Sequence, residues 1–217
     1  MKFLGYKVLS GKENMAFDEG LLNDAIKNLS GPVLRLYGWS EPTLSFGKNQ
    51  DIPLETKFPY VQRITGGRAL LHDKEITYCF VCHQDFLDNG QCVISSYKEI
   101  SEALVLGFAD LGIELGFPEY KRVSVQSGYC MNLSTGADLS YEGKKFIGSA
   151  QARKRGYILQ HGSILLDYDK ELLEKIFGEK LDDVISLKEI NPTLCNTKTL
   201  CEALKTGFEK KFGSFSD

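Results

Sequence analysis

Residues 137–166 read ADLSYEGKKFIGSAQARKRGYILQHGSILL, and this stretch decides the fold class. It predicts three consecutive strands, over residues 137–142, 144–151 and 157–166. Glu142-Gly143 predicts a tight hairpin turn between the first two strands, because glycine tolerates the backbone conformation that such turns require. Strands that follow one another without a helix between them are typical of an α+β protein, not of a regular strand–helix alternation.

The rest of the chain adds more strands and single helices. Apolar residues at helical spacing predict helices over residues 14–28, 95–111, 169–178 and 197–212. Further strands are predicted at residues 3–9, 33–37, 43–46, 59–64, 68–72, 75–83 and 184–187. We therefore expect an α+β fold with a mixed, largely antiparallel sheet and flanking helices. The sequence predicts one domain over residues 1–217, with about residues 169–217 as a candidate for a small C-terminal cap.

Composition excludes several classes of protein. The chain has 217 residues, of which 42% are apolar and 11% aromatic, so it can bury a core and is not a disordered chain. Its 26 basic and 29 acidic residues give a net charge of −3, which argues against general nucleic-acid binding. The sequence has no apolar run near the roughly 20 residues that cross a bilayer and no signal peptide at its start. We expect a cytoplasmic protein that binds neither nucleic acid nor membrane.

Six cysteines need separate explanations, at positions 79, 82, 92, 130, 195 and 201. Thiols stay reduced in the cytosol, so disulfides are not expected. Cys79 and Cys82 lie three residues apart in a strand-like run, where they point to opposite faces and cannot easily share a metal. We interpret them as buried packing residues and predict no metal site. Cys130 follows turn residues, so its thiol could be presented at a loop.

Residues 63–73, RITGGRALLHD, form the segment with the densest chemical signal. Gly66 and Gly67 let the backbone approach a ligand closely, and Arg68 and His72 add a cation and a titratable ring. One interpretation is a cradle for a carboxylate, carbonyl or phosphate group. The other is an ordinary glycine turn between two strands with surface charges, and the residues alone leave both open.

Two further segments combine polar residues with apolar strands. In residues 143–151, GKKFIGSAQ, Lys145 shares a strand face with Ile147 and would point inward if Ile147 does. A desolvated lysine can neutralise developing charge on an acyl oxygen, whereas a hairpin lysine in water would have no such role. In residues 160–166, QHGSILL, His161 fits a core histidine, and Gly162 indicates close approach of a ligand or backbone.

Five segments occur in the order found in the lipoate branch of the biotin/lipoate ligase superfamily, and the chain resembles that family over roughly residues 10–178. They are NMAFDE (14–19), LYGWSEPTLSFG (36–47), residues 65–73, residues 143–151 and QHGSIL (160–165). The resemblance implies a biotin/lipoate ligase-like fold. Residues 67–78 and Tyr129-Cys130 look most like the Gram-positive type of octanoyltransferase.

The resemblance implies an enzyme that moves octanoate from octanoyl-acyl-carrier protein to a lipoyl-domain lysine without a cofactor. In that reaction Cys130 carries the octanoyl group as a thioester, and Lys145 favours the thiolate and polarises the carbonyl. The acceptor would be a protein such as glycine cleavage H protein or the lipoyl domain of a dehydrogenase E2 subunit. The implied substrate-binding residues are Arg63, Thr65, Gly66, Gly67, Arg68, His72, Gly148, Ser149, Ala150, His161 and Gly162.

Two other activities of the same branch remain open. One is an ATP-dependent lipoate–protein ligase, for which ATP would be required. Gln62 stands where many relatives have the first arginine of a pair, which weakens a phosphate-binding role there. The other is an amidotransferase that moves octanoate or lipoate between lipoyl proteins. Cys195 is a second candidate nucleophile, because an Asn-Pro pair directly precedes the cysteine in another octanoyltransferase type, although here two residues lie between Pro192 and Cys195.

Overall fold

The computed structural model describes residues 1–52, 56–117 and 138–216. In this part of the chain, six strands form the main sheet in the order β1-β2-β6-β9-β8-β7, and three form a smaller sheet in the order β4-β3-β5. The strands are β1 (Lys2–Leu9), β2 (Val33–Trp39), β3 (Thr43–Phe46), β4 (Tyr60–Gln62), β5 (Leu70–His72), β6 (Glu75–His83), β7 (Leu139–Tyr141), β8 (Lys144–Lys154) and β9 (Tyr157–Leu165). In the main sheet β1 and β2 are parallel and every other neighbouring pair is antiparallel. The predicted α+β fold with a mixed, largely antiparallel sheet is therefore confirmed.

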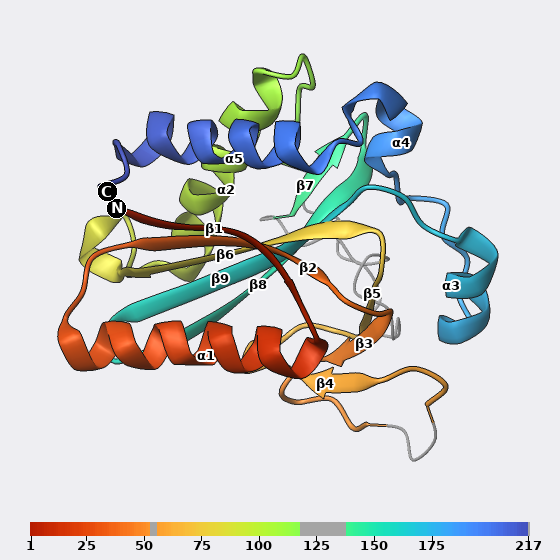
Figure 1. The fold of residues 1–217 in the computed structure, drawn as a ribbon, viewed down its shortest axis with the longest axis horizontal. Helices are drawn as coiled ribbons and strands as arrows, with labels where there is room; N and C mark the ends of the chain where they lie inside the picture. Colours follow the sequence, from red (N-terminus) through yellow and green to blue (C-terminus); the bar gives the residue numbers. More distant parts are fainter. Residues whose placement is uncertain (53–55, 118–137, 217) are drawn as a thin grey trace.

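Helices cover both faces of the main sheet (Figure 1). The described helices are α1 (Gly11–Asn28), α2 (Val93–Ala109), α3 (Lys170–Phe177), α4 (Leu187–Ile190) and α5 (Thr197–Phe212), with short 3-10 turns at Gln84–Phe86 and Pro192–Leu194. Helices α2 and α5 lie on one face and α1 on the other. The four helices predicted from apolar spacing are confirmed to within a few residues at their ends.

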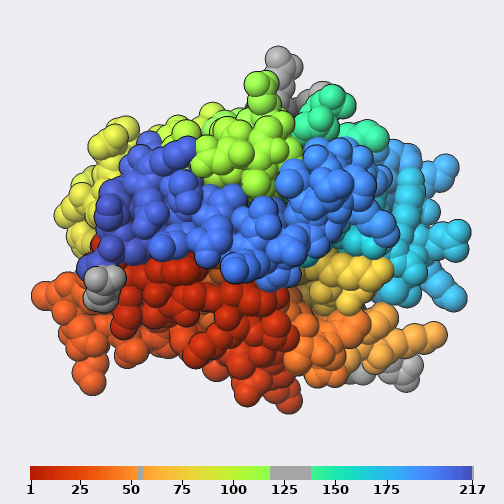
Figure 2. All heavy atoms as spheres, turned by 45° about the horizontal axis from the view of Figure 1, so that its top comes forward, coloured from red at the N-terminus to blue at the C-terminus, as the bar shows by residue number. Residues whose placement is uncertain are grey.

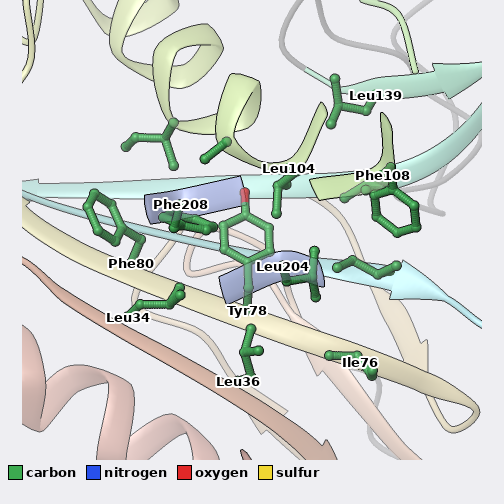
Figure 3. Packing of buried hydrophobic residues seen from close by; sticks show 14 of the residues in the cluster. Leu34, Leu36, Ile76, Tyr78, Phe80, Leu104, Phe108, Leu139, Leu204 and Phe208 are labelled. Atoms are coloured by element: carbon green, nitrogen blue, oxygen red, sulfur yellow. The ribbon is translucent and has the colours of Figure 1, made fainter. Parts of the chain in front are cut away.

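The face under α2 and α5 is an apolar core (Figure 3). Tyr78 and Phe80 of β6 point into it and pack against Phe208 of α5, all with no exposed surface. The two helices approach closely at paired glycines. A Cβ on Gly107 would lie 2.6 Å from the carbonyl oxygen of Ala203, so only glycine permits this crossing. In the space-filling view, the blue C-terminal residues run between green residues of α2 and the red N-terminal residues (Figure 2).

Helix α1 begins at a capping box and carries polar side chains on its buried face. Ser10 accepts a hydrogen bond from the backbone N–H of Glu13, and the Glu13 side chain accepts one from the backbone N–H of Ser10. Asn14, Asp18 and Leu22 follow at intervals of four and all face the sheet, with at most 3% of each exposed. A helix that buries a carboxylate needs partners for it, and the sheet supplies them.

The smaller sheet places the glycine-rich segment of residues 63–73. The segments predicted as strands at 59–64 and 68–72 form β4 and β5, which do not pair with each other. Instead β4 is parallel and β5 antiparallel to the central strand β3. The connection between them passes directly over the end of β3. A Cβ on Gly47 would lie 2.1 Å from the carbonyl oxygen of Gly67, so the two backbones are in direct contact.

The prediction of a strand at residues 184–187 is wrong. Val184 forms only an isolated bridge with Lys145, and Leu187 is the first residue of α4. Ser186 and Glu189 form a capping box that starts this helix, and this local signal outweighs the β-branched residues before it. The bridge still has a consequence, because the backbone of Lys145 donates to Asp183 and accepts from Ile185.

The predicted hairpin turn at residues 142–143 is confirmed. Glu142 and Gly143 have φ values of 48° and 80°, the left-handed pair that a two-residue turn between β7 and β8 requires. The chain ends lie side by side, since Ser216 donates its backbone N–H to the carbonyl of Met1 (Figure 1). No helix in the described ranges has the length and apolar character to span a membrane.

Candidate active site

A narrow pocket lies where α1, the smaller sheet and strands β2, β6, β8 and β9 meet. Its exposed lining is mainly carbon, although several polar side chains surround it. Seven of the predicted substrate-binding residues line it, which are Arg63, His72, Gly148, Ser149, Ala150, His161 and Gly162. Residues that are nearly one hundred positions apart in the sequence therefore meet at one hollow. The arrangement is suited to a slim ligand with an apolar body.

The remaining predicted residues of this group, at positions 65–68, lie in the connection between β4 and β5. Thr65 is fully buried and its hydroxyl lies 2.8 Å from Nε2 of His161. Gly67 has a φ of 90°, which favours glycine, and a Cβ there would lie 3.3 Å from the Arg63 guanidinium. We call residues 65–68 the acyl loop. The structure thus places the loop against the pocket wall.

Asp18 is the centre of one buried polar cluster. Its Oδ1 lies 2.6 Å from the Arg35 guanidinium, and its Oδ2 accepts hydrogen bonds from Tyr37 at 2.8 Å and from His161 Nδ1 at 3.0 Å. Asp18 and Arg35 have side chains that are 1% and 2% exposed. Burial and the nearby Asp18 carboxylate raise the pKa of Tyr37 well above its usual value. The hydroxyl therefore stays protonated and donates a hydrogen bond to Asp18.

Arg35 supplies the cation for this cluster from a strand position. Its guanidinium also donates to the side-chain oxygen of Asn14 at 2.5 Å, and it lies over the rings of Phe17 and Tyr37. Asn14 in turn donates to the backbone carbonyls of Leu9 and Gly38. Helix α1 is thereby tied to strand β2 through side chains that carry opposite charges and satisfy each other.

Glu75 is the centre of a second buried cluster. Its carboxylate accepts hydrogen bonds from His72 Nδ1 at 2.8 Å, Thr77 at 2.5 Å, Ser163 at 2.5 Å and the Trp39 indole at 3.2 Å. Burial alone would raise the pKa of Glu75, but His72 and these hydroxyl hydrogen bonds together hold it below its usual value. Glu75 is therefore a buried anion whose carboxylate oxygens accept hydrogen bonds from all four of these side chains.

His72 connects this carboxylate to Arg63. Its Nε2 lies 2.6 Å from the hydroxyl of Ser45, and the same hydroxyl accepts a hydrogen bond from Arg63 at 2.5 Å. The imidazole stacks on Trp39, with ring centres 3.9 Å apart. Burial lowers the pKa of His72 in spite of the opposing effect of Glu75, so the ring is neutral near pH 7.

Lys145, the predicted charge-neutralising residue, is buried next to Asp138. Its Nζ lies 2.9 Å from Oδ2 of Asp138, and both side chains are at most 4% exposed. Oδ1 of the same carboxylate accepts the backbone N–H of Ser149 at 3.4 Å, and Ser149 lines the pocket. Asp138 therefore links the lysine to the pocket wall. The sequence interpretation of an ordinary hairpin lysine in water is wrong.

Gly162 allows strand β9 to approach strand β8 and Tyr78 at the pocket. A Cβ on Gly162 would lie 2.5 Å from the Ser149 hydroxyl and 2.6 Å from the Tyr78 ring. Ser149 and Tyr78 are joined by a hydrogen bond of 2.8 Å, and Gln160 donates to the Tyr78 oxygen at 2.7 Å. Burial raises the pKa of Tyr78 to about 12, so this phenol is a hydrogen-bonding support and not an acid near pH 7.

Four of the six cysteines bear on the predicted packing and nucleophile roles. Cys130 lies outside the described residues. Cys79 and Cys82 are fully buried on opposite faces of β6, as predicted, and burial raises the pKa of each, that of Cys82 to about 12. Cys195 is exposed overall. The slight burial of its thiol and, to a smaller extent, the charge of nearby Asp167 raise the pKa of that thiol. Neither effect favours a thiolate at these positions. Within the described ranges, no group of three or more His, Cys, Asp or Glu side chains could hold a metal ion.

Sequence reasoning missed four charged residues of these clusters, namely Asp18, Arg35, Glu75 and Asp138. A signal for the first pair existed. Asn14 and Asp18 occupy the helix face that Leu22 and Ala25 continue, and Arg35 alternates with Leu34 and Leu36 in a strand that is otherwise apolar. Polar residues at positions of the buried face predict an internal polar cluster. Glu75 and Asp138 carry no such pattern.

Residues 10–209 match the protein family described as the lipoyl protein ligase A/B catalytic domain. Octanoyltransferase LipM of Carboxydothermus hydrogenoformans is 37% identical over 224 residues, covering 100% of this chain and 77% of the relative. Octanoyltransferase LipM of Halalkalibacterium halodurans is 35% identical over 224 residues, covering 91% of this chain and 81% of the relative. Among solved structures, lipoate-protein ligase A bound with ATP superimposes with a TM-score of 0.76 at 21% identity, covering 100% of this chain and 88% of that one.

Proposed function

The chain belongs to the lipoyl protein ligase A/B catalytic family, and we propose that it moves an octanoyl group from octanoyl-acyl-carrier protein to the lysine of a lipoyl domain. It is an octanoyltransferase of lipoate biosynthesis. The observation that carries this conclusion is the match, over at least nine-tenths of the chain, to relatives named as octanoyltransferases. The acceptor in this proposal is a protein such as glycine cleavage H protein or a dehydrogenase E2 lipoyl domain, and the reaction takes place in the cytoplasm.

In the proposed mechanism, the thiolate of Cys130 attacks the carbonyl carbon of the donor thioester. The new carbon–sulfur bond forms as the bond to the carrier's sulfur breaks, and the carrier leaves as a thiol after it takes up a proton. The amine of the target lysine then attacks the acyl-Cys130 carbonyl, loses a proton and releases the Cys130 thiol. One thioester is exchanged for another, so octanoate is held without ATP before the amide forms.

Lys145 is the cation that we assign to both steps. A buried ammonium group favours a nearby thiolate and neutralises the negative charge that develops on the acyl oxygen. Its position supports this role, because Asp138 orients Nζ and the backbone of β8 is bound on both sides, to Ser140 of β7 and to residues 183–185. A lysine held in this way loses little freedom when the reaction begins.

The pocket supports an acyl substrate. Gly148, Ala150 and Gly162 line it with little side-chain bulk, while Met15 and Leu70 add apolar surface. A straight eight-carbon chain gains about 0.8 kcal/mol for each CH₂ group that it buries. The proposed binding mode places that chain in the pocket, with its carbonyl toward the acyl loop and toward Lys145.

Intact-mass measurement tests the proposal directly. The protein is incubated with octanoyl-acyl-carrier protein alone, and we expect the wild type to gain one octanoyl group that Cys130→Ser cannot gain. Cys195→Ser is the matched control, because it removes a thiol that is exposed but lies outside the pocket, and it should be modified like the wild type. An unmodified wild-type protein would contradict the acyl-enzyme mechanism.

Parallel reactions with other donors separate the related activities. Transfer from an octanoylated lipoyl protein but not from octanoyl-acyl-carrier protein would identify an amidotransferase. Transfer from free lipoate that needs ATP and persists in Cys130→Ser would identify a ligase. We expect neither of these patterns.

A further inference from the structure

Two chains of buried polar side chains end at the acyl loop. Each begins at a carboxylate, passes through an imidazole and continues through a hydroxyl group, but the two start on different elements. They are Asp18–His161–Thr65, which begins on α1, and Glu75–His72–Ser45–Arg63, which begins on β6. The consecutive polar atoms of both chains lie between 2.5 and 3.0 Å apart. We call them the α1 relay and the β6 relay.

The chemistry of the end groups sets the direction of donation in the β6 relay. A guanidinium only donates hydrogen bonds and a carboxylate only accepts them. Arg63 therefore donates a hydrogen bond to the Ser45 hydroxyl, and Nδ1–H of His72 donates one to Glu75. Nε2 of a neutral His72 then carries a lone pair, which accepts a hydrogen bond from the Ser45 hydroxyl. The hydrogen bonds of this relay therefore all run in one direction, from Arg63 through Ser45 and His72 to Glu75.

The α1 relay joins the same kinds of group. The Asp18 carboxylate accepts a hydrogen bond from Nδ1 of His161, and Nε2 of His161 lies 2.8 Å from the hydroxyl of Thr65. Arg35 compensates the charge of Asp18 at 2.6 Å. The relay thus fixes the orientation of a hydroxyl group at the first residue of the loop.

The β6 relay fixes the backbone of the same loop. Nη2 of Arg63 donates to the carbonyl of Gly66 at 3.2 Å and to the carbonyl of Arg68 at 2.8 Å. Both carbonyl groups are thereby turned toward Arg63. Within the described ranges, the backbone N–H groups of Gly66 and Gly67 donate no hydrogen bond to the protein. The carbonyl groups of Thr65, Gly66 and Arg68 thus accept hydrogen bonds, from Lys48 and Arg63, while the two glycine N–H groups are available to a ligand.

We propose that the α1 and β6 relays are positioning devices for octanoyl transfer, which hold the acyl loop so that its backbone N–H groups meet the acyl carbonyl oxygen. The inference rests on the proposed function and adds Asp18, His161, Glu75, His72 and Ser45 as residues that act through Thr65 and Arg63. Preorganised donors stabilise an oxyanion only when they do not have to move during the reaction. Two relays, one at the first residue of the loop and one along its backbone, remove that movement.

Nitrogen-15 NMR of the imidazole rings tests the relays without any substrate. The chain has three histidines, and the third, His83, is 39% exposed, so His83→Gln identifies the two buried rings. We expect His72 to be neutral and protonated on Nδ1 at pH 7.5, and His161 to carry a proton on Nδ1 that faces Asp18. A His72 ring that is charged or protonated on Nε2 alone, or a His161 ring without a proton on Nδ1, would overturn the relay to which it belongs.

Kinetics test the effect on the reaction. Thr65→Val keeps the shape of the side chain but removes the hydroxyl, and Ser45→Ala breaks the β6 relay. We expect each to lower kcat about 10- to 100-fold with little change in the KM for the donor, because a misplaced loop weakens the transition state more than the bound substrate. Thr65→Ser restores the hydroxyl and should recover most of kcat.

Ser101→Ala is the matched control, because Ser101 is a fully buried serine that contacts Gln160 on the face of α2. It should keep the wild-type kcat. Circular dichroism and thermal unfolding confirm that each variant is folded. If the wild type transfers octanoate while folded Thr65→Val and Ser45→Ala keep full kcat, the inference fails. If the wild type transfers nothing from either donor, the proposed function fails, and the NMR result still decides the relays.

Discussion

Replacing Arg35 by methionine removes the positive charge from the buried cluster around Asp18. Arg35 and Asp18 are each almost fully buried and their charged atoms lie 2.6 Å apart. Breaking a buried ion pair at one partner costs about 3–5 kcal/mol, because the other charge remains without compensation. The variant also loses the hydrogen bond to Asn14 and the ring contacts with Phe17 and Tyr37, about 1 kcal/mol each.

Methionine returns part of this loss, since a buried methionine side chain contributes about 1.5–3 kcal/mol. We therefore expect Arg35→Met to lower the free energy of unfolding by about 4 kcal/mol. Domains of this kind are stable by about 5–15 kcal/mol, so the variant should fold but with a small margin. With a slope near 2–3 kcal/mol per M urea, the midpoint of urea unfolding should fall by about 1.5 M.

A double-mutant cycle in urea measures the pair itself. Asp18→Asn alone leaves Arg35 as an unpaired buried cation, whereas the combination with Arg35→Met leaves no charge. We expect the double variant to be at least about 2 kcal/mol more stable than the sum of the single losses predicts. Arg35→Lys is the charge-preserving comparison, and it should cost less than Arg35→Met because the ammonium still pairs with Asp18 but cannot reach Asn14 as well. A coupling energy below about 0.5 kcal/mol in this cycle would refute the idea of a compensated buried ion pair.

Three other outcomes follow from the site. Lys145→Met should reduce octanoyl-adduct formation at least about 100-fold in the intact-mass assay, and Asp138→Asn about 10-fold, while both keep the wild-type circular dichroism spectrum; unchanged rates would remove the lysine from the mechanism. The wild type should lose stability as the pH falls from about 6.5, because burial lowers the pKa of His72 and the unfolded chain then binds a proton that the folded chain does not. In urea titrations at several pH values, His72→Gln should reduce this dependence of the unfolding free energy on pH. Gly162→Ala should lower the melting temperature and weaken donor binding, since the new Cβ would lie 2.5 Å from the Ser149 hydroxyl, and a neutral effect would show that β8 can move.

The fold could be predicted largely from local patterns. The three strands of residues 137–166 follow from their residue patterns, the Glu-Gly turn between the first two follows from its glycine, and the helices follow from apolar spacing. Pairing in the smaller sheet could not be predicted, because β4 and β5 both pair with β3, a partner that no local signal identifies. The prediction of a strand at residues 184–187 failed because a short apolar run looks the same at the start of a helix. Only the helix-capping residues beside it distinguish the two. The single-domain boundary and the C-terminal cap stay predictions.

The site shows the same division between local and long-range information. Gly66, Gly67 and Gly162 could be singled out in the sequence as places where backbone can approach a ligand, but an ordinary turn remained open for the first two, and Gly148 followed only from the resemblance. The ion pairs could not, because the partners of Asp18 are 17, 19 and 143 positions away. Lys145 was ambiguous for a related reason: its burial depends on Asp138 and on residues 183–185, which only the folded chain brings to it. Cys130 stays a prediction.

The two faces of the main sheet differ in a way that accounts for where chemistry is located. Alternate residues of β6 point into the apolar core under α2 and α5, and the intervening residues point toward α1 and the pocket. On that second face Glu75 and Thr77 take positions that an ordinary core would give to aliphatic residues. An apolar replacement of such a cluster is often neutral or stabilising, so stability alone does not favour keeping it. The presence of the cluster is explained if the buried charges serve the acyl loop, because Gly66 and Gly67 at the centre of that loop have no side chains to hold it. In our proposal the polar face is therefore the part of the core that positions the substrate, and the apolar face is the part that keeps the sheet folded.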